Sequence, residues 1–328
     1  MLGAAEIGRK AVIPAILAAG GELRGLASRD PERGRGLAAT FQIPQLWSGY
    51  QQLLESDLDA VYIPLPNSLH LPWTLQALAA GKHVLCEKPL ALTSIEAGQM
   101  RKAADQAGLV LAEAVMYRYH PRWKVVRGLI DDGAVGELRH LQGSFTFPLG
   151  PPPNIRWQQE LGGGALYDIG SYLVSACRWL AGEPSRVLAR TGRRHGVDAD
   201  GAMLLEFPGP GGAISAELAY SFEAAEHQQL TVLGSEGSLQ VPTPFTAWTG
   251  QSIPLRLVRG SEGSAEVVPT PAADPYRAMV EAFAARVAGG PALLAPALDS
   301  ERGLTVLDAA RESLSTGAWA VPQGRLSP

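Results

Sequence analysis

The chain has 328 residues, 46% of them hydrophobic, and a formal net charge of −4. This composition is typical of a folded protein with room for two domains, and it excludes a disordered chain. The slightly acidic balance, with no dominant basic stripe, argues against nucleic acid as a partner. The two cysteines form no CxxC motif, and the sequence shows neither a signal peptide nor an apolar run that could span a bilayer, so we expect a cytoplasmic protein with no membrane partner.

The first 110 residues alternate short apolar runs with helical segments, which is the pattern of β-α-β units. Helices are expected over 68–80, where Gly81 is placed to end the helix, and after a capping box formed by Thr93 and Glu96. The apolar runs at 23–28, 60–64, 83–86 and 110–113 resemble strands of a parallel sheet that is covered by helices on both faces. The fold class predicted for this part is therefore α/β, doubly wound.

The pattern changes after His120 to longer alternating segments separated by glycine- and proline-rich turns. Such alternation predicts a large, mostly antiparallel open sheet. Helices are expected over 165–181, after Asp274 and Pro275, and over 300–316. The expected strands are 138–147, 186–191, 202–207, 213–222, 230–233 and 255–258. We therefore expect a doubly wound domain over 1–117 and an α+β domain over 118–328.

The chain begins with a glycine-containing loop, Gly3-Ala4-Ala5-Glu6-Ile7-Gly8, which has the spacing of the dinucleotide-binding fingerprint with Ala5 at the second glycine position. In that fingerprint a tight turn brings a pyrophosphate onto the N-terminus of a helix. An ordinary loop is the alternative, because glycine and alanine runs are common. Dinucleotide-binding domains carry an acidic residue that holds the ribose about 20 residues further on, so the residues at that position help to distinguish the fingerprint from an ordinary loop.

That position reads Ser28-Arg29-Asp30, with Arg33 shortly after it. A hydroxyl and guanidinium groups suit a 2′-phosphate, because arginine binds phosphate through paired hydrogen bonds. The local chemistry therefore favours NADP over NAD, the alternative being that these are solvated surface residues.

Only Met1 and Leu2 precede Gly3, although the strand before such a loop lies in the middle of its sheet. Without that strand, buried backbone groups would be unpaired at a cost of about 1–3 kcal/mol each. We expect either that the recorded start is too late or that another segment supplies the pairing.

Two further signals follow the ends of predicted strands, where open α/β sheets bind ligands. One is Pro64-Leu65-Pro66-Asn67 with the nearby His70, and the other is Glu87-Lys88-Pro89. Packing gives little reason for a lysine directly after a buried strand and before a proline. An exposed Glu–Lys pair at a helix entry is the alternative interpretation.

These motifs resemble the glucose–fructose oxidoreductase / inositol dehydrogenase (Gfo/Idh/MocA) family. The likeness covers essentially the whole chain, because three later motifs fall in the expected order: 116–121 (MYRYHP), 162–172 (GGGALYDIGSY) and 274–277 (DPYR). The similar subgroup contains NADP-dependent xylose dehydrogenases and dimeric dihydrodiol dehydrogenases. The resemblance implies a Rossmann-type first domain, and a second domain for substrate binding and oligomerisation.

The resemblance also implies catalytic roles. Tyr172 is similar to the acid/base tyrosine of the family, and Lys88 would favour its phenolate and polarise the substrate oxygen. Asp168, four residues before Tyr172, faces the same side of a helix and would orient a substrate hydroxyl or cap the helix. Substrate contacts are also expected from Asn154, Arg156 and Trp157. The expected cofactor-binding residues are Gly3, Ala4, Ala5, Glu6, Ile7, Ser28, Arg29, Arg33, Leu65, Pro66, Asn67, His70, Glu87, Lys88 and Arg118.

The function predicted from these residues is an NADP(H)-dependent oxidoreductase that acts on a hydroxyl of a sugar, polyol or diol. The alternative is a sensor or regulator of the same fold that binds NADP(H) without turnover. No metal is expected, because the sequence has neither HExxH nor a cysteine–histidine cluster. The open sheet suggests a homodimer or homotetramer.

Overall fold

The computed structural model describes residues 1–246, 250–260, 263, 265–291, 293 and 295–323. They fall into two compact units. Unit 1 comprises Met1–Tyr119 and Asp274–Glu301, and unit 2 comprises His120–Ala273 and Arg302–Pro328. A single boundary at residue 117 does not anticipate the return of 274–301 to unit 1. Within the described ranges, no helix has both the length and the apolar character needed to cross a membrane.

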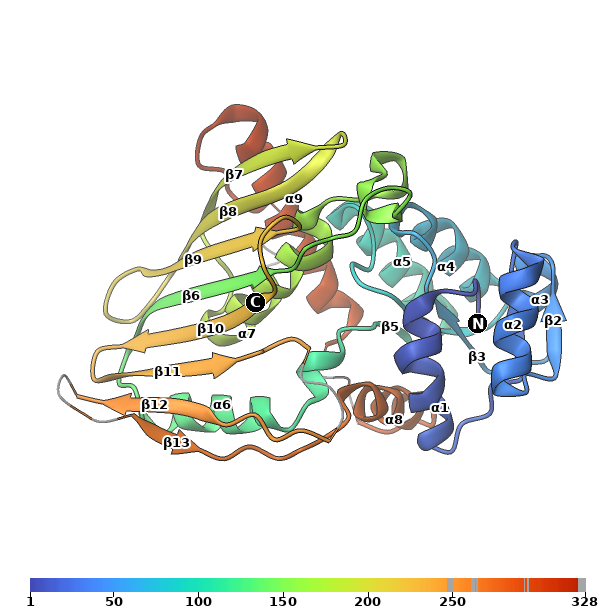
Figure 1. Ribbon diagram of the computed structural model, residues 1–328, viewed down its shortest axis with the longest axis horizontal. Helices are drawn as coiled ribbons and strands as arrows, with labels where there is room; N and C mark the ends of the chain where they lie inside the picture. Colours follow the sequence, from blue (N-terminus) through green and yellow to red (C-terminus); the bar gives the residue numbers. More distant parts are fainter. Residues whose placement is uncertain (247–249, 261–262, 264, 292, 294, 324–328) are drawn as a thin grey trace. The chain divides into compact units, whose positions relative to one another are not determined.

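Unit 1 is built on short parallel strands (Figure 1). β1 (Gly25–Ala27) pairs with β2 (Gln45–Trp47), and β4 (His83–Cys86) lies between β3 (Ala60–Ile63) and β5 (Leu111–Glu113). β1, β3 and β4 are largely buried, as strands covered on both faces must be. The four strands expected in this part are present, and β2 is an addition that its short, partly exposed sequence does not reveal.

Residues 1–3 lie between these two groups of strands. Leu2 forms a parallel bridge with Ala27 and donates its N–H to the Tyr62 carbonyl at 2.9 Å, and the Gly3 N–H donates to the Ala27 carbonyl at 2.7 Å. Met1 and Leu2 are both buried. The pairing expected from an additional segment is thus supplied by the first three residues themselves, and it joins β1 and β3 into one doubly wound arrangement.

Two helix starts in unit 1 that the sequence predicts have side-chain caps. Thr93 accepts the Glu96 N–H at 3.2 Å, which confirms the predicted helix start, although the Glu96 carboxylate reaches the Leu92 N–H instead of that of Thr93. Asp274 caps the helix that follows it, as predicted. That helix packs against η1, α1 and η3, which explains why it belongs to unit 1. The helices are η1 (Gly8–Val12), α1 (Ile13–Ala18), α2 (Pro31–Phe41), α3 (Tyr50–Leu54), η2 (Asn67–Leu69), α4 (His70–Ala79), α5 (Ser94–Ala107), η3 (Met116–Tyr119) and α8 (Pro275–Val287).

Unit 2 contains an eight-stranded sheet in the order β13-β12-β11-β10-β6-β9-β8-β7 (Figure 1). Its neighbours are antiparallel except for β6 and β9. This confirms the predicted open, mostly antiparallel sheet, with β11 and β13 as strands not expected. The bounds are β6 (Leu138–Thr146), β7 (Arg186–Arg194), β8 (Val197–Phe207), β9 (Ile214–Ser221), β10 (His227–Gly234), β11 (Gly237–Pro242), β12 (Leu255–Arg259) and β13 (Glu266–Val268).

One face of this sheet is covered by helices. α7 (Ser171–Ala181) packs on β6 and β9, and a Cβ on Gly143 would lie 3.0 Å from Leu173 Cδ2. Before α7 the chain forms η4 (Ile155–Trp157), η5 (Gln159–Leu161) and η6 (Leu166–Gly170), a wider π-type turn. α6 (Arg122–Asp131) and α9 (Ala297–Thr316) are the remaining helices.

Candidate active site

The turn after β4 carries Lys88, and its neighbour Glu87 is held by a buried tyrosine. The Tyr62 hydroxyl donates to Glu87 Oε1 at 2.6 Å, and the Lys88 N–H reaches the other carboxylate oxygen at 3.3 Å. Burial raises the pKa of Tyr62 well above its usual value, so this hydroxyl stays protonated and remains a donor. Glu87 therefore fixes the direction of the turn.

His70 at the start of α4 links this turn to the loop after β3. Its Nδ1 lies 2.9 Å from the Pro89 carbonyl oxygen and its Nε2 lies 2.8 Å from that of Leu65. The side chain is fully buried, and burial lowers its pKa. A buried ring with both nitrogens against backbone carbonyls does not fit the expected cofactor contact. His70 instead holds Leu65, and with it Pro66 and Asn67, against the Lys88 turn.

A third polar group, Glu113 at the end of β5, is missing from the residues that sequence reasoning selected. Its Oε1 accepts the N–H of Leu90, the second residue after Lys88, at 2.8 Å. Burial raises the pKa of Glu113 to about 7. The available signal was its position, because Glu113, like Glu87, follows a buried strand at the carboxyl edge of the sheet.

The glycine loop is tightly packed at both of its glycines. Gly3 has a φ of +94°, and a Cβ there would lie 2.9 Å from Leu65 Cδ2. A Cβ on Gly8 would lie 2.9 Å from the Met1 sulfur. Packing against Leu65 and Met1 therefore requires glycine at both positions, and the backbone of Gly3, Ala4 and Ala5 is a candidate phosphate cradle. The Glu6 carboxylate turns to Arg9 on the exposed helix surface, at 2.5 and 2.9 Å, so only the backbone of Glu6 and Ile7 is suited to a phosphate.

At the position expected to bind the ribose, the acidic residue Asp30 already has hydrogen-bond partners. The Asp30 carboxylate caps α2 by accepting the N–H groups of Glu32 and Arg33 at 3.1 and 3.0 Å. Ser28 is buried, and its hydroxyl donates to the Asp30 carbonyl at 2.8 Å. Arg29 and Arg33 are exposed, Arg29 with its guanidinium 5.9 Å from the Tyr50 ring centre. The two arginines, more than Ser28, fit a 2′-phosphate.

Arg118 lies in η3 and is buried within unit 1. Its Nη1 is 3.5 Å from Asp299 Oδ2 at the start of α9. A charge held in this way is fixed in position. Arg118 is expected to contact the cofactor, and it also has a structural partner, Asp299.

Tyr172 stands in the first turn of α7, in unit 2. Its ring centre lies 5.7 Å from that of Phe145 and 5.4 Å from that of Phe245, and these two phenylalanines stack at 5.5 Å. Aromatic packing of this kind fixes the position of the ring, but it does not by itself orient the hydroxyl group. Tyr172 is thus held by apolar contacts, on the face of the sheet covered by helices.

Asp168 lies in η6, and its Oδ2 accepts a hydrogen bond from Arg156 Nε at 2.6 Å. Its side chain is 15% exposed, so a polar edge remains accessible. The alternative role of Asp168 as the helix cap is filled by another residue. Asp198 of β8 accepts the Leu166 N–H at 2.5 Å, and burial raises the pKa of Asp198 to about 6.

The glycine run before η6 is explained by close packing. A Cβ on Gly164, where φ is +120°, would lie 2.2 Å from Asp198 Oδ1, and a Cβ on Gly163 would lie 2.5 Å from the Arg156 carbonyl oxygen. The Gly164 N–H donates to that same carbonyl at 3.0 Å. The run thus wraps Arg156 and Asp198 and sets where the helix with Asp168 and Tyr172 begins.

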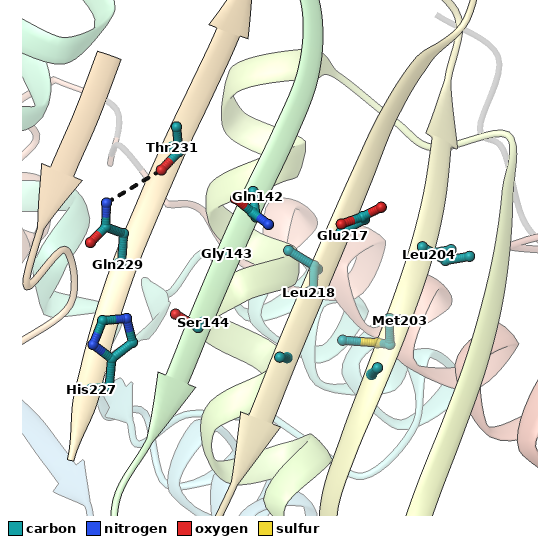
Figure 2. A pocket seen from close by; sticks show the side chains of 12 residues that line it. Gln142, Gly143, Ser144, Met203, Leu204, Glu217, Leu218, His227, Gln229 and Thr231 are labelled. Atoms are coloured by element: carbon teal, nitrogen blue, oxygen red, sulfur yellow. Dashed lines mark hydrogen bonds between the residues drawn. The ribbon is translucent and has the colours of Figure 1, made fainter. Parts of the chain in front are cut away.

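The other face of the sheet in unit 2 is open and slightly hollowed. Figure 2 shows side chains of β6, β8, β9 and β10 around a hollow of about 480 Å³. Gln142 pairs with Glu217 and Thr231 across three strands, so polar residues form a row there. This hollow lies on the opposite face of the sheet from α7. Among the residues that the structure describes, no cluster of three or more His, Cys, Asp or Glu side chains is suited to a metal ion.

Comparison with known proteins covers both parts of the chain. A family model described as "Oxidoreductase family, NAD-binding Rossmann fold" matches residues 1–115, and one described as "GFO/IDH/MocA C-terminal domain" matches residues 123–240. The dTDP-3,4-didehydro-2,6-dideoxy-alpha-D-glucose 3-reductase of Streptomyces violaceoruber is 41% identical over 87% of this chain and 83% of its own. The D-xylose 1-dehydrogenase (NADP(+)) 2 of Haloferax volcanii is 37% identical over 97% of both chains.

A solved structure shares the fold closely. The 3-ketoreductase of Actinomadura kijaniata, in complex with NADP and TDP-benzene, matches with a TM-score of 0.89 at 34% identity, covering 95% of this chain and 96% of that chain.

Proposed function

Because the chain belongs to the Gfo/Idh/MocA oxidoreductase family, we propose that it is an NADP(H)-dependent enzyme that transfers a hydride between the nicotinamide and a hydroxyl carbon of a sugar, polyol or diol. The observation that carries the proposal is the turn at Lys88. It places a cation at the end of a buried strand and is held by Glu87, His70 and Glu113. So many buried polar contacts at one lysine turn fit a positioned catalytic group.

When bound, the nicotinamide supplies or accepts the hydride. The chain's own residues handle the proton and the charge on oxygen. The Tyr172 phenolate takes the proton of the substrate hydroxyl in oxidation, and the Tyr172 hydroxyl donates a proton to the substrate oxygen in reduction. The Lys88 ammonium stabilises the negative charge that develops on that oxygen, and Asp168 accepts a hydrogen bond from a second substrate hydroxyl. The proposal therefore assigns the proton to Tyr172 and the charge on the oxygen to Lys88 in one reaction step.

The cofactor proposal rests on the cradle of unit 1. The backbone of residues 3–7 would hold the pyrophosphate, and Arg29 and Arg33 the 2′-phosphate, because Asp30 is engaged as a helix cap. Leu65, Pro66 and Asn67 would line the nicotinamide side, together with Lys88. Two proteins matched above carry NADP in their names or crystals, which supports this choice.

Binding and turnover are tested separately. We expect fluorescence titration to show NADPH binding at least tenfold tighter than NADH, and Arg29→Ala with Arg33→Ala to remove that preference. Arg35→Ala, on the same exposed helix, is the matched control. Equal affinity for the two cofactors would contradict the NADP assignment.

The substrate class is tested with a panel of aldoses, diols and nucleotide-linked keto sugars, because the relatives include a xylose dehydrogenase and keto-sugar reductases. We expect turnover on at least one of them, followed by the absorbance of the reduced nicotinamide. Lys88→Ala should remove it, whereas Lys102→Ala, an exposed lysine of α5, should not. Tight NADPH binding without turnover on the whole panel would favour the sensor alternative.

We further propose that a second copy of the chain covers the open face of the sheet. Leu204 on that face is 42% exposed, beside the small residues Ala202 and Ala219. An uncovered sheet face with such residues is a poor surface for a monomer. Ala219→Arg should convert the oligomer to monomer in light-scattering measurements, and a monomeric wild type would contradict this proposal.

We also propose that the enzyme works in the cytoplasm. The two cysteines are buried and form no disulfide, which suits a reducing compartment.

A further inference from the structure

We infer that Arg122 is a positioning residue for Tyr172 and that it acts through Phe245. This inference rests on the proposed role of Tyr172 in proton transfer. Arg122 is the first residue of α6 and is 1% exposed. Its Nη1 donates to the Thr243 carbonyl at 2.9 Å, and its Nη2 donates to the Pro242 carbonyl at 2.7 Å. Within unit 2, these two hydrogen bonds tie the chain that leaves β11 to the start of α6.

Stability alone gives little reason for an arginine at this position. Among the residues that the structure describes, no carboxylate pairs with the Arg122 guanidinium, and its Nε is buried without a hydrogen-bond partner. A cation in the first turn of a helix also opposes the helix dipole. A buried charge with an unpaired N–H lowers stability, so its presence calls for another reason. Holding the two carbonyl oxygens after β11 is the role that the contacts of this side chain supply.

The segment that Arg122 holds is strained. Thr243 has a φ of +44°, in the left-handed region that residues with a branched Cβ rarely adopt. The neighbouring strand β10 gives the segment a second support, because the Gln228 carbonyl accepts the Thr243 N–H at 3.1 Å and the Gln228 Nε2 donates to Thr246 Oγ1 at 2.7 Å. A strained turn persists only where its surroundings fix it. Loss of the two hydrogen bonds from Arg122 should therefore let this segment relax.

Phe245 lies in this segment and connects it to Tyr172. The Phe245 side chain is 1% exposed, its ring centre lies 5.4 Å from that of Tyr172, and it stacks on Phe145 at 5.5 Å. Closely packed rings in a protein interior transmit a displacement from one to the next. Relaxation of the segment should therefore displace the Tyr172 ring together with its hydroxyl, and a small misplacement of a reacting group lowers the rate strongly.

Steady-state kinetics with a substrate from the panel tests the inference first. Arg122→Met removes both hydrogen bonds and keeps a long, unbranched side chain, and Lys124→Met, at an exposed position of the same helix, is the matched control. We expect Arg122→Met to lower kcat about tenfold, with KM and NADPH affinity within about twofold of the wild type. Arg122→Lys keeps the charge but loses the planar fork, so its kcat should fall about threefold.

A double-mutant cycle separates an action through Phe245 from a general effect on folding. Phe245→Leu removes the ring that contacts Tyr172. If Arg122 acts through that ring, Arg122→Met should lower kcat by less than about twofold when Phe245 is already replaced by leucine.

A second readout does not need turnover. 3-Fluorotyrosine, introduced at position 172 through an expanded genetic code, reports on the surroundings of this ring in the ¹⁹F NMR spectrum. We expect Arg122→Met to displace or broaden the fluorine line of the otherwise unchanged protein, and Lys124→Met to leave it as it is.

Three results would overturn the inference: wild-type kcat in a folded Arg122→Met enzyme, a loss that multiplies with that of Phe245→Leu, or an unchanged fluorine line. If Arg122→Met does not fold, the same measurements on Arg122→Lys decide. If the wild type has no turnover, the proposed function fails, and the fluorine spectrum still decides whether Arg122 sets the position of the Tyr172 ring.

Discussion

The two units hold their proposed reactive side chains in different ways. In unit 1 the Lys88 turn is fixed by hydrogen bonds with buried polar groups: Glu87, which Tyr62 holds, His70, and Glu113. In unit 2 Tyr172 is fixed by the packing of Phe145 and Phe245, and its helix starts where a glycine run closes on Asp198.

The difference follows from the elements that carry the two residues. A turn after a strand has no regular hydrogen-bonding pattern of its own, so side chains must supply its partners. A helix supplies its own hydrogen bonds and needs only a fixed start and a packed face. Substitutions around the Lys88 turn should therefore act mainly through polar contacts, and those in the glycine run or the aromatic packing around Tyr172 should act mainly through steric fit.

The largest effect on stability is expected from Gly164→Ala. The new Cβ would lie 2.2 Å from Asp198 Oδ1, and φ is +120°, so strain and a clash add up. We expect a loss of about 3 kcal/mol or more in the free energy of unfolding, measured with urea. Gly182→Ala is the control, because its φ is +86° but no atom lies within 4 Å of the added Cβ. Equal losses at both positions would show that backbone strain alone matters and would contradict a steric role for the contact between Gly164 and Asp198.

In unit 1 the strongest effect should come from His70→Phe, because the neutral ring donates its single N–H to the Pro89 or the Leu65 carbonyl oxygen and that oxygen loses its buried donor. We expect a loss of about 2–3 kcal/mol in stability and at least a tenfold weaker NADPH affinity, because both loops at the nicotinamide end shift. His83→Phe, at the opposite end of β4, should leave NADPH affinity unchanged. A His70 variant that is destabilised but binds NADPH normally would confine His70 to folding.

Sequence reasoning selected both of the proposed reactive residues, but it did not identify the side chains that hold them. Lys88 and Tyr172 sit in motifs that can be read along the chain, and the caps at Thr93 and Asp274 are local signals that the structure confirms. Glu113 and Asp198 lie 25 and 26 residues from Lys88 and Tyr172, and periodicity says nothing about which strand becomes a neighbour of which. The return of 274–301 to unit 1 escaped prediction for the same reason, since the contacts of α8 with η1 and α1 are long-range.

The two buried carboxyls should give each unit its own pH dependence. Burial raises the pKa of Asp198 from 3.8 to about 6 and that of Glu113 from 4.5 to about 7. A raised carboxyl pKa in the folded state means that stability is highest when the group is protonated and falls as pH rises toward the folded pKa. Each group should lower the free energy of unfolding by roughly 2–3 kcal/mol across its window. Asp198→Asn should remove the slope between pH 4 and 6, and Glu113→Gln the slope up to pH 7, in urea unfolding at several pH values. Parallel curves for wild type and variants would show that neither carboxyl is buried as described.

The smallest effect is expected from Tyr62→Phe, which removes the hydroxyl that donates to Glu87 at 2.6 Å and keeps the ring. Stability should fall by about 1–2 kcal/mol and kcat by a few-fold, since Glu87 then loses its fixed direction. Tyr220→Phe, a buried tyrosine of unit 2, should change stability without changing kcat. A Tyr62 variant with wild-type kcat would show that Glu87 needs no support.

A double-mutant cycle on kcat/KM, with a substrate from the panel, tests whether Lys88 and Tyr172 serve one hydride-transfer step. Tyr172→Phe keeps the ring that packs on Phe145 and Phe245, so its effect reports on the hydroxyl. We predict that Lys88→Ala and Tyr172→Phe each lower kcat/KM by about 10³-fold and that the double variant is hardly worse than either, as for groups that act as a unit. Losses that multiply, or a Tyr172→Phe enzyme with wild-type turnover, would contradict a shared site.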